Sequence, residues 1–207
     1  MNRFQSFILS SGARNVMKLL SANVVAQVIG LVVYPFLTRI YSPEDFGLLN
    51  LFLSIGNVLV VLSVADYYYS IVLPKDERHA IALVYVSLIP LILTTVIILI
   101  SILFAKQISN LFNSPNLVDY YWLLPIYVLV IGLWNVLNYW YIRQKKFGSI
   151  SAYQISQNIL SSGGKMVLGY EGILQGGMIY SVVLAPILSL VMSILFRFRS
   201  TLRPLLH

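Results

Sequence analysis

The sequence contains no cysteine, which excludes a disulfide framework, a thiol nucleophile and a cysteine-ligated metal. It has two histidines, His79 and His207, which are too few and too far apart in sequence to indicate a metal site. Only 10% of its residues are charged, whereas a soluble domain carries about 25%. With 58% hydrophobic residues and a mean hydropathy of +0.83, this composition predicts an integral membrane protein.

Acidic residues are also scarce, with 7 against 14 basic ones, a formal net charge of +7. The basic residues fall in short clusters between apolar runs, a pattern typical of membrane orientation, so no nucleic-acid partner is predicted. The sequence has no glycine-rich phosphate loop, no nucleophile elbow and no HExxH motif. We therefore predict no enzyme activity, no catalytic residue, no cofactor and no metal. The amino terminus lacks the pattern of a removable signal peptide.

Six apolar runs are each long enough to cross a bilayer core, which takes about 20 residues. They predict an all-α membrane protein with about six transmembrane helices, near 19–38, 47–72, 80–104, 120–142, 151–169 and 173–196. Residues 1–18 form a mixed polar and basic segment that suits an interfacial helix, and residues 197–207 form a basic tail. The predicted domains are thus an amino-terminal segment, a six-helix bundle over 19–196 and a cytoplasmic tail.

The basic residues alternate between connections in a way that predicts orientation. With the amino terminus in the cytoplasm, the inner segments hold eleven basic residues and the outer connections hold two, Arg39 and Lys106. Short connections are where the positive-inside rule applies, so we expect both termini of this multi-pass protein in the cytoplasm. The eleven are Arg3, Arg14, Lys18, Lys75, Arg78, Arg143, Lys145, Lys146, Arg197, Arg199 and Arg203.

The first two predicted spans are joined by a short polar turn. Ser42 is a good N-cap residue, Pro43 stands where a missing N–H costs nothing, and Asp45 holds the capping-box position. A helix should therefore begin near Pro43. Arg39 and Tyr41 end the preceding helix, and both side chains suit the interface between water and lipid.

Several predicted helices carry polar side chains on one face at helical spacing. These include Asn23 and Gln27 in the first, Asn57 in the second, Asn138 in the fourth, and Gln154, Asn158 and Lys165 in the fifth. Such groups either pair between helices or face a hydrated cavity, because lipid offers them no hydrogen bond. Lys165 has the further alternative of reaching the interface from near its helix end. Asp66 lies near the inner end of the second predicted helix, at headgroup level or in the cavity.

Three blocks of sequence carry a resemblance to a known family. Residues 36–47, FLTRIYSPEDFG, resemble the first hairpin of Wzx-type O-antigen and polysaccharide flippases of the multidrug/oligosaccharidyl-lipid/polysaccharide exporter superfamily. Residues 70–79, SIVLPKDERH, resemble the inner loop that follows the family's second helix. Residues 138–150, NYWYIRQKKFGSI, resemble the aromatic-to-basic end of its fourth helix. The resemblance covers the chain up to about residue 160.

The resemblance implies a multi-pass transporter of the cytoplasmic (inner) cell membrane, which flips a polyprenyl-pyrophosphate-linked oligosaccharide by alternating access. The headgroup would enter a hydrated cavity from the cytoplasmic side while its tail stays in lipid. Arg39 and Lys165 are candidates for attracting phosphate or acidic sugar, and Asp66 for coupling to an ion or proton. The candidates for hydrogen bonds to sugar hydroxyls are Asn23, Gln27, Asn57, Asn138, Gln154 and Asn158.

The chain departs from the family pattern in two ways. Asp66, Tyr67 and Tyr68 stand where the family often has an Arg-Tyr-Glu-like group. Family members carry about twelve or more helices in two pseudo-symmetric bundles, and this chain resembles the amino-terminal bundle alone. The expected partners are therefore membrane lipid, an undecaprenyl-pyrophosphate-linked glycan, and a second six-helix half or a second copy. The alternatives are a small-molecule exporter of the same superfamily, a membrane glycosyltransferase or polymerase, and a truncated, non-functional remnant.

Overall fold

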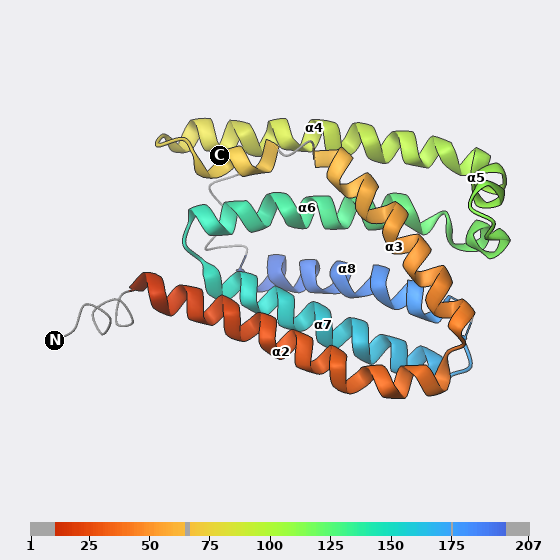
Figure 1. Cartoon of the computed structure of the whole chain (residues 1–207). Coiled ribbons are helices and arrows are strands. Elements are labelled where there is room, and N and C mark those ends of the chain that lie inside the picture. Colours follow the sequence, from red (N-terminus) through yellow and green to blue (C-terminus); the bar gives the residue numbers. More distant parts are fainter. Residues whose placement is uncertain (1–10, 65–66, 175, 198–207) are drawn as a thin grey trace.

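The computed structural model describes residues 11–64, 67–174 and 176–197, and every regular element in these ranges is helical (Figure 1). This confirms the predicted all-α fold. The elements are α2 (Ser11–Ile40), α3 (Pro43–Val64), η1 (Tyr67–Val72), α4 (Glu77–Ser101), η2 (Ile102–Phe104), α5 (Ala105–Leu111), η3 (Pro115–Tyr120), α6 (Leu123–Arg143), α7 (Phe147–Tyr170) and α8 (Gly177–Arg197).

The long helices run alternately up and down, so their connections gather at two opposite ends of the bundle (Figure 1). Helix α7 packs between α2 and α8, and α6 packs with α3 and α4. Contacts of α8 with α6 and α3 join the two groups. One end holds the connections 73–76 and 144–146, and the other holds the α2–α3 turn and the connection from α7 to α8. Which end faces the cytoplasm stays a prediction.

The turn between α2 and α3 has the predicted capping box. The Ser42 N–H and hydroxyl both donate to Asp45 Oδ2 at 3.0 Å, and the Asp45 N–H donates to Ser42 Oγ at 3.3 Å. Helix α3 begins at Pro43, where the sequence placed it. The reciprocal bonds satisfy N–H groups that have no partner within the helix, which is why so short a turn can reverse the chain.

Within the described parts of the chain, four helical segments are long and apolar enough to cross a membrane: Pro43–Ser63, Glu77–Leu111, Leu123–Arg143 and Gly177–Leu195. In α2 the apolar part is shorter, Gln27–Ile40, and α7 carries the most polar of the predicted spans. Helix α2 also runs without a break from Ser11 through the predicted interfacial segment. The protein is thus a multi-pass membrane protein, and the count of six spans stays a prediction.

The structure corrects two predicted boundaries. The helix predicted over 47–72 is wrong over its last six residues, because Tyr67–Val72 form the separate 3-10 helix η1. The η1 segment packs against α4 and α6, with Ile71 fully buried and Tyr68 and Tyr69 each 4.9 Å from the Tyr139 ring. This tertiary packing outweighs the local preference for a continued α-helix. The predicted loop 105–119 likewise contains the short helices α5 and η3.

Helix α6 lies at the centre of the core and contributes many of its buried residues. Glycines let neighbouring helices approach it closely. A Cβ on Gly56 of α3 would lie 2.8 Å from the Tyr127 ring, and one on Gly132 would collide with Leu91 of α4. Small residues commonly mark such contacts in membrane proteins, where packing rather than apolar burial holds helices together.

Candidate functional site

The structure describes the side chain of only one of the predicted site residues on α2 and near the end of α3. Gln27 is exposed on α2, whose main packing partner is α7. Asp66 and the Asn23 side chain lie outside the described residues, so their proposed roles stay predictions.

Asn57 on α3 is tied to α6 by a hydrogen bond. The Tyr127 hydroxyl donates to Asn57 Oδ1 at 2.9 Å. This is the interhelical pairing that the sequence left open as one alternative for a membrane amide. The bond leaves the Asn57 amide nitrogen as the group that can still donate to a substrate.

Asn138 on α6 and Gln154 on α7 each bury a side-chain oxygen that has no hydrogen-bond partner among the described residues. Both lie along their helices next to one aromatic stack, in which the ring centroids of Trp134 and Tyr153 are 3.3 Å apart and nearly parallel. An unpaired buried acceptor costs about 1–3 kcal/mol, so its presence calls for a donor from water or from a bound molecule. These two oxygens are buried acceptors, so a hydroxyl donor reaches them only when the helices around them separate.

Asn158 and Lys165 continue the polar stripe of α7. The Asn158 amide donates to the Gln154 carbonyl at 2.9 Å, a bond within the helix, and both side chains are half-buried. Lys165 is half-buried too and lies in the last turns of α7. One turn farther on, a Cβ on Gly169 would lie 2.5 Å from Ile40 of α2, which locates the contact between these helices.

Tyr41 brings the two predicted phosphate-attracting residues to one end of the bundle. Its ring is 4% exposed, and its hydroxyl donates to the Lys165 carbonyl at 2.7 Å. Burial, and then the nearby Asp45 charge, raise the pKa of this hydroxyl, which keeps it protonated and able to donate. Arg39 is exposed two residues before Tyr41. The structure therefore places Arg39 and Lys165 at the same end, the end that the orientation rule puts outside.

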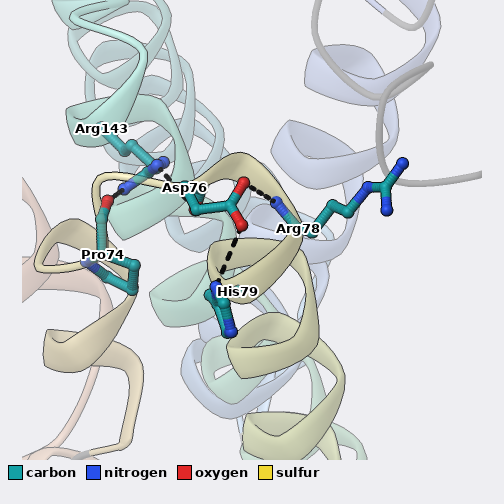
Figure 2. A network of polar contacts seen from close by, with 5 residues as sticks. All are labelled: Pro74, Asp76, Arg78, His79 and Arg143. Carbon is teal, nitrogen blue, oxygen red and sulfur yellow. Dashed lines mark hydrogen bonds and ion pairs between the residues drawn. The ribbon is translucent and has the colours of Figure 1, made fainter.

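At the opposite end of the bundle, Arg143 forms a network of hydrogen bonds (Figure 2). From the sequence, this residue counted only as one of the inner positive charges. Its guanidinium donates to the carbonyls of Pro74 at 2.6 Å, Ile71 at 3.2 Å and Asp76 at 3.3 Å. The Asp76 side chain in turn caps α4, accepting from the Arg78 N–H at 3.3 Å and contacting His79 Nδ1 at 3.1 Å. Arg143 thus ties the end of α6 to the connection between η1 and α4.

Replacing Arg143 by glutamine should loosen this connection, because a shorter neutral side chain cannot reach three carbonyls. Hydrogen bonds from a charged donor are worth about 1.5–3 kcal/mol each, so we expect broad-specificity protease to cut residues 73–78 of the purified protein at least about tenfold faster. Arg78→Gln is the matched control, because the Arg78 side chain points away from the network (Figure 2). Equal cleavage of the two variants would contradict the tethering role.

Comparison with known proteins adds one finding. A family model described as polysaccharide biosynthesis protein matches residues 36–207. The match includes α3 to α8 and the Arg143 network, and it begins within α2. No curated protein and no solved structure matches the chain.

Proposed function

The chain belongs to the polysaccharide biosynthesis protein family, and we propose that it moves a polyprenyl-pyrophosphate-linked oligosaccharide across the cytoplasmic membrane. The family and the apolar helices support a membrane transporter concerned with polysaccharide. The finer proposal is that the cargo is the repeat unit of an O-antigen, capsule or exopolysaccharide, and that transport is by alternating access. This mechanism needs two halves around a central site, so a second bundle or a second copy completes the transporter.

The observation that carries the proposal is the pair of unpartnered acceptors, Asn138 Oδ1 and Gln154 Oε1. Sugars are rich in hydroxyl groups, which can donate to such oxygens. The Trp134 and Tyr153 rings, which stack on each other between α6 and α7, are buried at 9% and 2% exposed. Neutral acceptors suit an oligosaccharide better than they suit an inorganic ion.

The cations support the second part of the cargo, its pyrophosphate. Arg39 and Lys165 both lie at the end of the bundle that holds the α2–α3 turn. Glu44, Asp45, Asp119 and Glu171 lie at this end too, so the attraction for the anionic headgroup comes from the two cationic side chains themselves rather than from a positive potential of the whole end. Lys165 is the stronger candidate, since its half-buried position is less screened by water than the exposed Arg39.

The carboxylates argue against the rival function, a small-molecule exporter of cations. Within the described ranges, every aspartate and glutamate lies at a helix end or in a connection: Glu44, Asp45, Asp76, Glu77, Asp119 and Glu171. A cavity for organic cations needs negative charge deeper in the bundle. Asp66, the candidate for ion coupling, stays a prediction.

The proposal is tested by complementation in cells that lack their own polysaccharide flippase. The chain is expressed alone and together with the second bundle of a relative, and polymer at the cell surface is measured. Polymer in either arm supports the proposal. Stable insertion of the chain without polymer in both arms contradicts it.

Gln154→Leu sharpens this assay, because it separates transport from stability. Removing an unsatisfied acceptor should leave thermal stability unchanged or raised, whereas the lost hydrogen bond should lower surface polymer about fivefold to tenfold. Gln157→Leu is the matched control, since Gln157 is a half-buried amide on the same helix. If Gln154→Leu exports normally, its oxygen does not contact the cargo.

A further inference from the structure

A small polar hollow, the α3–η3 hollow, lies between the first turn of α3 and the 3-10 helix η3. These two elements contact each other at the end of the bundle that holds the α2–α3 turn (Figure 1). The volume of the hollow is about 300 Å³, at the lower end of the range of about 300–1,000 Å³ for sites that bind small molecules. Two of its lining side chains, Leu48 and Tyr120, are buried. The others are polar or acidic and are exposed or half-buried: Ser42, Glu44, Asp45, Asn116 and Asp119.

The three carboxylates that line the hollow have no basic partner. Glu44 and Asp45 lie in the first turn of α3, where negative charge stabilises a helix, but Asp119 comes from η3 and has no such role. Within the described ranges, no basic side chain forms an ion pair with any of the three. The basic residues nearest to them along the chain, Arg39 and Lys106, are exposed. The hollow therefore presents negative charge that no ion pair within these ranges compensates.

Tyr120 brings an unpaired hydroxyl to the same hollow. Its side chain is only 8% exposed, and its hydroxyl has no hydrogen-bond partner among the described residues. Burial, then the nearby Tyr180, and then the charges of Asp119 and Asp45 raise the pKa of this hydroxyl, which keeps it protonated. The two carboxylates thus lie close enough to act on it. Because buried hydroxyls are nearly always paired, this one indicates a polar group bound in the hollow.

The chemistry of the lining limits what can bind there. Carboxylate, amide and hydroxyl oxygens accept hydrogen bonds, so the occupant is a cation that donates them. A metal ion fits poorly, because within the described ranges no three acidic or histidine side chains are grouped closely enough to ligate one. A primary ammonium group carries three N–H donors, which can reach oxygens on both α3 and η3. The carbon atoms next to it can pack on Leu48 and on the face of the Tyr120 ring.

We propose that the α3–η3 hollow binds the primary ammonium group of a small organic amine, which donates hydrogen bonds to Asp45, Asp119 and the Tyr120 hydroxyl. Asp45 offers Oδ1, because its capping-box bonds use Oδ2. The amine is either free in solution or part of an ethanolamine lipid headgroup. The bound group joins the start of α3 to the connection between α5 and α6. Neither Asn138 nor Gln154 lines this hollow, so the site does not rest on the proposed function.

Native mass spectrometry and thermal unfolding of the full chain test the proposal and identify the source of the amine. The protein is titrated with phosphatidylethanolamine, with phosphatidylcholine of the same acyl chains, and with free ethanolamine and choline. We expect the ethanolamine form to bind at least about tenfold more tightly than the choline form, whose quaternary nitrogen has no N–H donor. A preference among the lipids assigns the site to a headgroup, and a preference only between the free amines assigns it to a soluble amine. Equal binding in both pairs, or equal stabilisation by calcium, would overturn the proposal.

Asp119→Asn locates the binding site. The change removes one carboxylate from the hollow and keeps the size of the side chain, and we expect it to weaken amine binding about tenfold. Glu171→Gln is the matched control, since Glu171 is an exposed carboxylate at the same end of the bundle that does not line the hollow. Equal weakening by the two changes would mean that amines gather at this end by general charge attraction, and it would overturn the proposal. Unchanged binding of Asp119→Asn would overturn it too.

Tyr120→Phe tests the hydroxyl separately from the charge. The ring that packs edge-on against Tyr180 stays in place, so without amine the thermal stability should be unchanged or raised. Amine binding should fall about fivefold to tenfold, because one hydrogen bond to the ammonium group is lost. Tyr180→Phe is the control, since Tyr180 contacts the same ring but does not line the hollow. Unchanged amine binding of Tyr120→Phe would mean that water pairs this hydroxyl, and it would overturn the proposed contact.

Discussion

Replacing Gly176 by alanine is expected to prevent most of the protein from reaching a stable fold. The residue has φ +81°, where an L side chain is strained at a cost of about 1–3 kcal/mol. Its new Cβ would also collide with the ring of Tyr120, which is 8% exposed and packs edge-on against Tyr180. Overpacking adds about 1–3 kcal/mol. The total approaches the whole stability of many domains, so fluorescence size-exclusion of a tagged variant should show little monodisperse protein.

Gly172→Ala is the control that separates the two costs. Gly172 has nearly the same backbone angle, φ +79°, but a Cβ there meets nothing within 4 Å. The Gly172→Ala variant should lose only the free energy of unfolding that the strained backbone costs, about 1–3 kcal/mol, and should still fold. A second check combines Gly176→Ala with Tyr120→Leu, which removes the ring and should recover part of the loss. Equal yields for Gly176→Ala and Gly172→Ala would mean that the Tyr120 contact costs nothing.

Replacing Lys165 by glutamine is expected to lower surface polymer at least about tenfold in the complementation assay. A charge-assisted hydrogen bond to phosphate is worth about 1.5–3 kcal/mol, and a neutral amide keeps only part of it. Lys165→Arg retains the charge and should keep most of the activity. Arg39→Gln should have a smaller effect, because Arg39 is exposed and its interactions are screened by water and salt.

The amount of each variant in the membrane is measured alongside the polymer. The alternative role for Lys165 is to reach the interface from near its helix end, without contacting cargo. In that role glutamine and arginine variants would export equally well. Equal export at equal protein level would therefore remove Lys165 from the proposed site, and a matched loss of protein and polymer would assign it to folding.

The parts of the fold that depend on neighbours in sequence were predictable. Ser42 and Asp45 are three residues apart, so their capping box could be read directly, and α3 begins where it predicts. Contacts between distant residues could not be read in this way. The 3-10 helix η1 packs Tyr68 and Tyr69 against Tyr139, whereas periodicity alone continued the preceding α-helix to residue 72.

In the candidate site, too, features set by neighbours in sequence were predictable and contacts between distant residues were not. Helical spacing placed Gln154, Asn158 and Lys165 on one stripe of α7, but it could not show that Tyr127 would bind Asn57 from 70 positions away. Arg143 was missed as a tether because its acceptors are backbone carbonyls, which no residue type reveals. The only signal was its place at the end of the aromatic run 139–141.

The position of Tyr41 sets an order of events during synthesis. Its hydroxyl binds the carbonyl of a residue that lies 124 positions later, and its ring abuts Gly169 and Gly177. At about 5–20 residues per second, the ribosome delivers these partners roughly 6–27 s after Tyr41 itself. The first hairpin therefore enters the membrane with this ring unburied. The Tyr41 ring is buried only after α7 and α8 have been inserted, so its hydrogen bond forms late in the assembly of these helices.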